Sequence, residues 1–301
     1  MKNFIILALV SILLLIACSD NTAPRRYSEL SYYLCGILEA GYFVDADHPI
    51  LLGKTEEISS LIDTTLSVTD AEIVLMEIVD SQIRQSVILV WDAAAGGYID
   101  LDEELLIKTG LEYRIEASLG ENIQLSGETI VPNQISVFGD SLVSDMPAWG
   151  NYPNDGQWHE LILEEVNSNH PIQIGTQDNE EFNLLTEFYC LEEYWNAEYT
   201  YPPEDNDFPV DNQEYMGDVH QYPRRNMGYY MYQPDNFMVN FNSYQSSLLF
   251  YGKTEASVYS IDSNYLKYLY KSDGYTEGGI IGGIGVFGSK WGKKLYTRII
   301  K

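Results

Sequence analysis

Positive charge is scarce in this chain of 301 residues. Lysine and arginine number 17 against 45 aspartates and glutamates, which gives a formal net charge of −28. Nucleic acids and anionic lipid headgroups are polyanions, so the long-range field of such a protein repels both. The charge therefore argues against nucleic acid and anionic headgroups as partners. Cations, basic proteins and neutral glycans remain as candidate partners.

Long hydrophobic runs are also missing, apart from one at the N-terminus. Phe4 to Ala17 form an apolar run that is interrupted only by Ser11 and preceded by Lys2. A membrane-spanning helix needs about 20 apolar residues, so this run is too short, and no stop-transfer pattern follows it. A short apolar run behind a positive start is typical of a signal peptide, which we assign to residues 1–17.

Cysteine is rare, with three in the chain. The first ends the tract Leu15-Ile16-Ala17-Cys18, which resembles the lipobox of bacterial lipoproteins. The resemblance implies cleavage before Cys18 and lipid on that cysteine. Residues 18–33, with Pro24, Arg25 and Arg26 among small polar residues, are predicted to be the lipidated cysteine and a tether. The alternative is a plain secretory signal with an incidental cysteine. The next residue is Ser19 and not aspartate, which resembles the sorting signal of outer-membrane lipoproteins. Whether the protein faces the periplasm or the cell surface stays open.

The two other cysteines, Cys35 and Cys190, form an even pair in a chain that the signal peptide sends to an oxidising compartment. Such a pair is a candidate disulfide. The alternative is two buried thiols, because a reduced cysteine behaves as a small apolar side chain.

Short strands dominate the prediction for residues 34–138. Hydrophobic residues make up 45% of the chain and aromatic residues 13%, which is enough for a folded core. Runs rich in β-branched and aromatic residues alternate with turn signals, without helical periodicity between them. This spacing predicts a small β-sandwich. The clearest predicted strands cover 71–76, 86–91, 111–119 and 134–138.

Four motifs follow one another in this unit: Ala71-Glu72-Ile73-Val74, Gly97-Tyr98-Ile99, Gly110-Leu111-Glu112-Tyr113 and Thr129-Ile130-Val131-Pro132. Their order resembles a family of uncharacterised envelope lipoproteins of Gram-negative bacteria, whose N-terminal half is a transthyretin-like or carboxypeptidase-regulatory-like β-sandwich. The tract 282–288 is similar to the closing motif of that family. The resemblance implies a lipid-anchored outer-membrane protein with no assigned activity, often encoded beside TonB-dependent transporters. It brings no catalytic residues and no cofactor.

Residues 139–301 are predicted as a second β-rich region with long irregular acidic loops and many tyrosines. Strand patterns return at 237–241, 247–251 and 256–261, and 264–270 predicts one short helix. Exposed tyrosines offer rigid apolar area with a polar tip, which suits glycans and peptides. Tyrosine is also a favoured strand residue, so its abundance alone does not separate the two interpretations.

Two tracts suggest ligands without completing a motif. Asp205-Asn206-Asp207-Phe208-Pro209 begins like an EF-hand loop, but proline stands at the third ligand position and the required glycine is absent. We interpret it as part of a solvated acidic loop and predict no metal site. Gly283 to Gly288 match a dinucleotide fingerprint, but no acidic residue follows, so these glycines are predicted in a closing strand or turn.

The tract Ile135 to Leu142 resembles the nucleophile block of the GDSL-type esterases, with Ser141 as the candidate nucleophile. That family places its catalytic histidine in an Asp-x-x-His motif near the C-terminus. Here the last histidine is His220 and the single Asp-x-x-His stands at Asp45 to His48, before the serine. We therefore predict Ser141 in a turn that leaves the first sandwich.

Together these observations predict an all-β or β-dominated protein with a transthyretin-like sandwich at 34–138. The leading functional hypothesis is a lipid-anchored envelope protein with a non-catalytic accessory or binding role, serving a TonB-dependent transporter or surface adhesion, with a glycan or peptide as ligand. One alternative is a serine esterase centred on Ser141. The other is a purely structural envelope lipoprotein.

Overall fold

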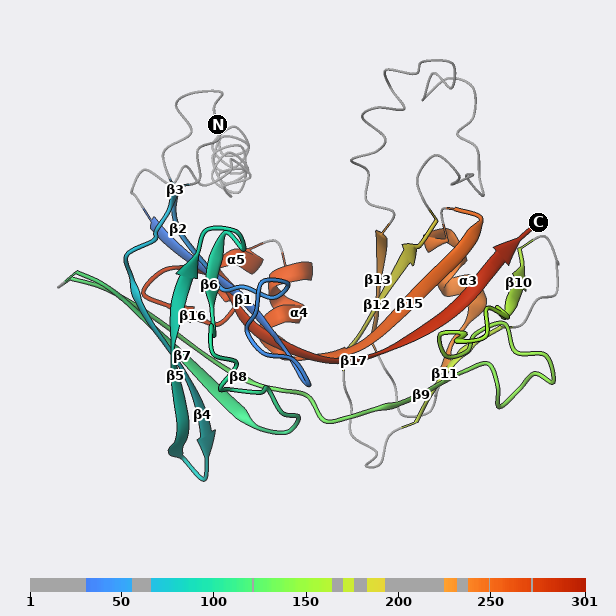
Figure 1. Ribbon diagram of the computed structural model, residues 1–301, viewed down its shortest axis with the longest axis horizontal. Helices are drawn as coiled ribbons and strands as arrows, with labels where there is room; N and C mark the ends of the chain where they lie inside the picture. Colours follow the sequence, from blue (N-terminus) through green and yellow to red (C-terminus); the bar gives the residue numbers. More distant parts are fainter. Residues whose placement is uncertain are drawn as a thin grey trace, which may run out of the picture.

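Strands make up most of the described chain, and helices are few (Figure 1). The computed structural model describes residues 31–55, 66–120, 122–163, 170–175, 183–192, 225–231, 238–248, 250–271 and 273–301. The predicted β-dominated fold is confirmed. The signal peptide, Cys18 and residues 193–224 of the acidic segment lie outside the described residues. No helix in the described ranges is long and apolar enough to cross a membrane.

The first lobe of the molecule is a sandwich of two sheets. One sheet has six strands in the order β16-β8-β7-β4-β5-β6. Its strands follow the predicted motifs, because β4 begins directly after Ala71, Gly97 opens β6, and β8 ends two residues before Pro132. The strands are β4 (Glu72–Val79), β5 (Gln82–Asp92), β6 (Gly97–Ile99), β7 (Glu112–Leu119), β8 (Ile123–Ile130) and β16 (Ile280–Ile281).

The second sheet has eight strands and runs through both lobes. Its order is β13-β12-β15-β17-β1-β2-β3, and β10 pairs with β17 in addition. The part formed by β1, β2, β3 and the start of β17 belongs to the first lobe. Its strands are β1 (Ser31–Glu39), β2 (Leu51–Thr55), β3 (Leu66–Ser67), β10 (Glu160–Ile162), β12 (Asn183–Cys190), β13 (Arg225–Met231), β15 (Gly252–Ile261) and β17 (Ile284–Ile300).

The core of the first lobe lies between these two sheets. Leu34 and Leu52 reach it from the eight-stranded sheet, Leu75 and Ile115 from the six-stranded sheet, and all four are at most 2% exposed. Phe287 of β17 joins the same cluster. Residues at alternate positions of each strand point to the same face, so each strand supplies every second residue to the core.

The second lobe has its own core. A three-stranded sheet in the order β14-β11-β9 packs on one face of β12, β15 and β17, and α3 adds Phe241 and Tyr244. The ring of Tyr244 stacks on Phe188 with centroids 5.3 Å apart and meets Trp149 edge-on at 6.0 Å. The added elements are β9 (Ser136–Gly139), β11 (Ile172–Gly175), β14 (Met238–Val239), α3 (Phe241–Tyr244) and the 3₁₀ turn η2 (Gln245–Ser247).

Distant residues complete the sandwich that the sequence predicts within 34–138. β17 pairs in parallel with β1, with Leu34 opposite Gly285, and β16 pairs with β8, with Ile280 opposite Gly127. The first lobe therefore includes residues from the C-terminal part of the chain. Figure 1 shows β17 as the long curved strand that passes from one lobe into the other.

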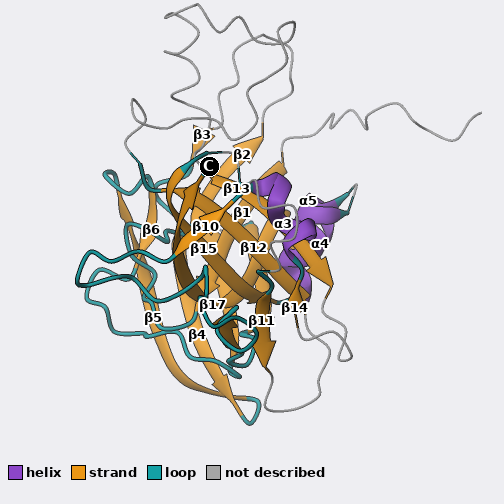
Figure 2. Cartoon of the chain, turned by 90° about the vertical axis from the view of Figure 1, so that its right-hand side faces the viewer, coloured by secondary structure: helices purple, strands orange, loops and turns teal. Residues whose placement is uncertain are grey.

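The helix predicted at 264–270 is confirmed as α4 (Ser263–Tyr270), which a short helix, α5 (Gly274–Glu277), follows. Asp262 caps α4, because its carboxylate accepts hydrogen bonds from the backbone nitrogens of Asn264 and Tyr265. The same carboxylate accepts from the backbone nitrogen of Ser289 in β17, which ties the helix to the strand. Figure 2 shows the helices at the margin of the strands.

Two further predictions have different outcomes. The described residues of the strand predicted at 247–251 form no strand, because Ser247 ends the 3₁₀ turn η2, Phe250 makes an isolated bridge and β15 begins at Gly252. Leu248 and Phe250 are both buried, and alternation of buried residues alone does not identify a strand. The glycines at 282–288 form a turn and the start of β17, as predicted. Gly285 has φ of 118°, and a Cβ there would lie 2.1 Å from the carbonyl oxygen of Leu34.

Candidate functional site

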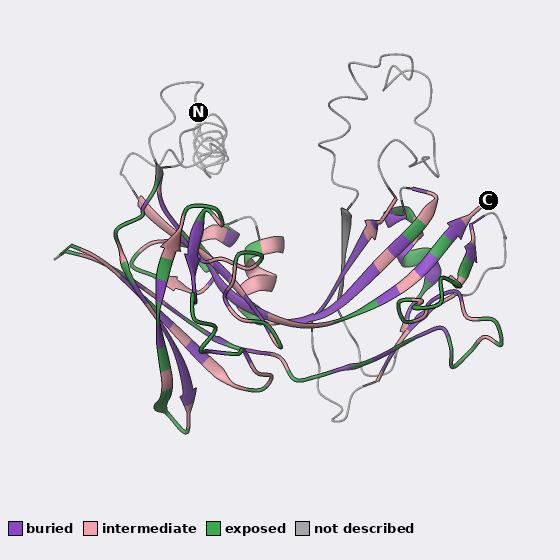
Figure 3. Ribbon diagram, in the orientation of Figure 1, coloured by how far each residue is buried: buried purple, intermediate pink, exposed green. Residues whose placement is uncertain are grey.

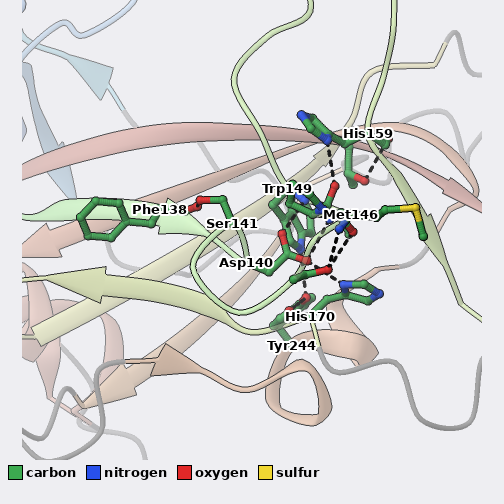
Figure 4. Close-up of polar contacts among 12 residues, drawn as sticks. Phe138, Asp140, Ser141, Met146, Trp149, His159, His170 and Tyr244 are labelled. Carbon is green, nitrogen blue, oxygen red and sulfur yellow. Dashed lines mark hydrogen bonds and ion pairs between the residues drawn. The ribbon is translucent and has the colours of Figure 1, made fainter.

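Ser141, the candidate nucleophile, lies in a turn directly after β9 (Figure 4). Its hydroxyl is exposed and donates a hydrogen bond to the carbonyl oxygen of Phe138 at 2.8 Å. Residues 140–149 form turns and bends, so no helix follows the serine. The predicted turn is confirmed, but β9 belongs to the three-stranded sheet of the second lobe, so the turn lies within that lobe and not at the exit of the first sandwich.

Asp140, next to this serine, is fully buried and organises the loop. Its carboxylate accepts hydrogen bonds from the backbone nitrogens of Ala148 at 2.8 Å and Trp149 at 3.0 Å. It also pairs with Nδ1 of His170 at 2.6 Å. A buried carboxylate is stable only when its oxygens are paired, and these three contacts fulfil that requirement while closing the loop.

His170 was not among the candidates from the sequence, because it stands 30 positions from Asp140 and matches no motif. The hydroxyl of Tyr244 donates to the carbonyl oxygen of His170 and accepts from Nε1 of Trp149 at 3.0 Å. In Figure 4, Ser141 and His170 lie on opposite sides of Asp140. Within the described chain Ser141 makes no hydrogen bond to a histidine, so hydroxyl, imidazole and carboxylate do not form the relay of a serine hydrolase.

The predicted disulfide requires a correction, because the fold separates its two cysteines. Cys190 of β12 lies opposite Thr254 of β15, which lies opposite Thr297 of β17, whereas Cys35 of β1 lies opposite Val286. Val286 and Thr297 are eleven positions apart on β17, which at about 3.3 Å per residue is roughly 35 Å along the strand. The Cα atoms of a disulfide lie within about 7 Å, and the structure does not join the pair. Burial raises the pKa of the Cys35 thiol.

Three aromatic rings gather where the second lobe meets solvent. Tyr152 and Trp158 come from the loop before β10, and Tyr296 comes from β17. The ring of Tyr152 meets Tyr296 edge-on with centroids 5.1 Å apart and meets Trp158 at 5.7 Å. Trp158 and Tyr296 are 6.4 Å apart. Tyr152 is 56% exposed. We call Tyr152, Trp158 and Tyr296 the aromatic platform.

Charged side chains border the aromatic platform. The hydroxyl of Tyr296 donates to Glu255 at 3.0 Å, and the amine of Lys294 lies 3.0 Å from the same carboxylate. Burial and the neighbouring Glu255 raise the pKa of Tyr296. Burial lowers the pKa of Lys294, but the hydrogen bond to Glu255 outweighs it and the net shift is upward. The amine of Lys253 lies 5.7 Å from the centre of the Trp158 ring. In the pairing of β15 with β17, Lys253 lies opposite Arg298.

The tyrosines of the second region divide between core and surface. Tyr244 and Tyr259 are at most 5% exposed, as strand and core residues would be, whereas Tyr270 is 48% exposed. The tyrosines of the aromatic platform, Tyr152 and Tyr296, belong to this region, but the sequence did not single them out. A signal was present, because Tyr296 and Arg298 alternate with Leu295, Thr297 and Ile299, which is the pattern of a strand with one open face.

A second charged cluster lies where the two lobes join. Glu39 of β1 pairs with Lys290 of β17 at 2.9 Å and with His48 at 3.5 Å, and His48 also contacts Asp45 at 3.1 Å. The Glu39 carboxylate raises the pKa of His48, burial opposes it, and Asp45 raises the pKa further. Burial raises the pKa of Glu39, but the hydrogen bonds from His48 and Lys290 outweigh it, and the net shift is downward.

No family model matches the sequence, and no curated protein matches it. Trypsin-activated alpha-2-macroglobulin from Escherichia coli aligns with a TM-score of 0.22 and 12% identity over 93% of this chain and 16% of that chain. A bacterial ice-binding adhesin of 1.5 MDa, studied for host cell surface retention, aligns with a TM-score of 0.21 and 8% identity over 93% of this chain and 66% of that chain. Likeness at this level supports no conclusion about function.

Proposed function

We propose that the protein is a lipid-anchored, non-catalytic binding protein of the bacterial outer membrane, acting beside a TonB-dependent transporter or in surface adhesion. The aromatic platform is the observation that supports a binding role. Rigid aromatic side chains that remain at the surface of a folded domain provide contact area for a ligand at low cost in conformational entropy.

The surroundings of Ser141 support the non-catalytic part of the proposal. A serine hydroxyl is a weak nucleophile until a base accepts its proton, and here the hydroxyl is bonded to the carbonyl oxygen of Phe138. His170, which pairs with the residue next to this serine, has its Nδ1 on Asp140. The arrangement suits a closed turn better than an esterase site.

Anchoring is tested by Cys18→Ser. We expect the variant to lose lipid labelling completely and to leave the membrane fraction, because a single-atom change removes the thiol that carries the lipid. Cys35→Ser is the matched control, and it should stay labelled and membrane-bound. The measurement is metabolic labelling with a fatty acid followed by fractionation. A Cys18→Ser protein that still partitions with membranes would refute the lipid anchor.

A further inference from the structure

We propose that the aromatic platform is a binding subsite for an uncharged carbohydrate chain, an inference that rests on the binding role proposed above. Sugar rings carry C–H groups on one face and hydroxyls around the edge. A complementary site therefore needs flat apolar area bordered by hydrogen-bonding groups.

The three rings provide the apolar area. Their edge-to-face contacts, with centroids 5.1 to 6.4 Å apart, hold the rings at steep angles to one another, so they cannot close over each other as a flat stack does. Tyr152, at 56% exposed, leaves more than half of its surface to a ligand. The hydrogen bond from the hydroxyl of Tyr296 to Glu255 restrains this side chain, so its ring is held in place before a ligand binds.

The border of the aromatic platform provides both donors and acceptors. Glu255 accepts from Tyr296, Lys294 and Ser257, which orients its carboxylate. Lys253 and Arg298 are exposed and lie side by side on β15 and β17, and neither forms an ion pair within the described chain. An ammonium and a guanidinium can only donate, whereas a carboxylate can only accept. Sugar hydroxyls do both.

Charge favours an uncharged ligand over an acidic one. With a net charge of −28, the protein repels polyanions at long range. Near the aromatic platform the charges are mixed, because Glu255 and Glu192 lie among the cations Lys253, Lys294 and Arg298. Glu192 accepts a hydrogen bond from the backbone nitrogen of Lys253 at 2.9 Å. A neutral glycan meets no opposing field.

Backbone pairing favours a sugar over an extended peptide. Peptides commonly bind by adding a strand to a free sheet edge, where main-chain groups supply the affinity. At the platform both edges of β17 are occupied. β15 pairs along one side, and Gly150 exchanges backbone hydrogen bonds with Tyr296 on the other, beyond which β10 pairs with Arg298. A ligand here must be recognised by side chains alone.

The test measures binding by calorimetry with the full chain carrying Cys18→Ser. The probes are uncharged hexasaccharides of glucose, xylose, galactose and mannose, an acidic polygalacturonate and a pool of unstructured peptides. We expect at least one uncharged hexasaccharide to bind, and its Kd to change less than about twofold between low and high salt because no charge is screened. Trp158→Ala should weaken binding at least about tenfold, and Tyr152→Ala by a smaller factor.

Tyr270→Ala is the matched control, because this tyrosine is 48% exposed but lies on α4, outside the platform. It should leave Kd unchanged, and circular dichroism should show all variants folded. Binding that survives Trp158→Ala, or that occurs only with polygalacturonate and falls with salt, overturns this inference. Binding of peptides alone also overturns it while leaving the binding role intact. No binding to any probe refutes both proposals.

Discussion

The two halves of β17 share one extended backbone but have different surroundings. Residues 285–289 are buried without interruption, whereas buried and less buried residues alternate from 295 to 299 (Figure 3). The first half is covered on both faces, since Phe287 packs into the sandwich core and Gly288 lies against Tyr265 of α4. The second half is covered on one face only, by the core of the second lobe.

The composition of the strand follows this difference. No charged residue occurs in its first six positions, from Ile284 to Ser289, whereas Lys290, Lys293, Lys294 and Arg298 follow in the remainder. A strand that is buried on both faces is apolar throughout, and a strand with one open face alternates. The open face is the one that carries the aromatic platform, so the half of β17 with one open face is the half available to a ligand.

The largest test of this contrast compares two aromatic residues of the same strand. Phe287→Ala should lower the free energy of unfolding by about 3–5 kcal/mol, because it opens a cavity in a closed core. Tyr296→Ala should lower it by about 1 kcal/mol, because it removes one hydrogen bond and a half-buried ring. Urea unfolding of both variants measures the two losses. Equal losses would show that the halves of β17 do not differ in their contribution to stability.

Local patterns predicted the elements of the fold better than their assembly. The strands β4, β5 and β7 and helix α4 were predicted because alternation, turn residues and helical spacing are local. The parallel pairing of β1 with β17 was not, since it joins residues some 250 positions apart that no local signal connects. For the same reason the disulfide prediction was wrong. Two cysteines were known, but the register that separates them was not.

The candidate site was harder to predict than the fold. Ser141 was correctly assigned to a turn from the neighbouring glycine and aspartate. His170 and the aromatic platform were missed, because each depends on a contact across a long stretch of chain, such as that between Tyr152 and Tyr296. When side chains are brought together only by the tertiary structure, the sequence does not show their contact. It shows only the alternation of buried and exposed residues within each strand.

A smaller effect is expected at the charged cluster, where β17 changes from one environment to the other. The folded pKa of His48 lies above its usual 6.5, so His48 stabilises the fold fully below that pH and loses this contribution as pH rises through the folded pKa. The folded pKa of Glu39 lies below its usual 4.5, so its contribution is lost as pH falls. Stability from the cluster is therefore greatest at mildly acidic pH.

The measurement compares His48→Gln with the unaltered protein by urea unfolding from about pH 5 to about pH 9. The difference should be about 1 kcal/mol or less at mildly acidic pH, because His48 is partly open to solvent, and it should shrink above neutrality. In a Glu39→Gln background the pH dependence should decrease, since the first partner of the imidazole is gone. A difference that grows with pH would contradict the assigned pKa shift.

The smallest effect is expected at Ser141, in the turn that follows β9 in the second lobe. Its exposed hydroxyl bonds to the carbonyl oxygen of Phe138, whereas Asp140 beside it carries the buried contacts that close the loop. Ser141→Ala should change the free energy of unfolding by no more than about 0.5 kcal/mol.

If the serine were a nucleophile, the same change would remove most of any esterase activity, because the members of a triad act as a unit. We expect no such activity and no labelling by a fluorophosphonate probe. Short-chain aryl esters and the probe, applied to both proteins, measure this, and labelling that disappears in Ser141→Ala would make the protein a hydrolase and the turn its active site.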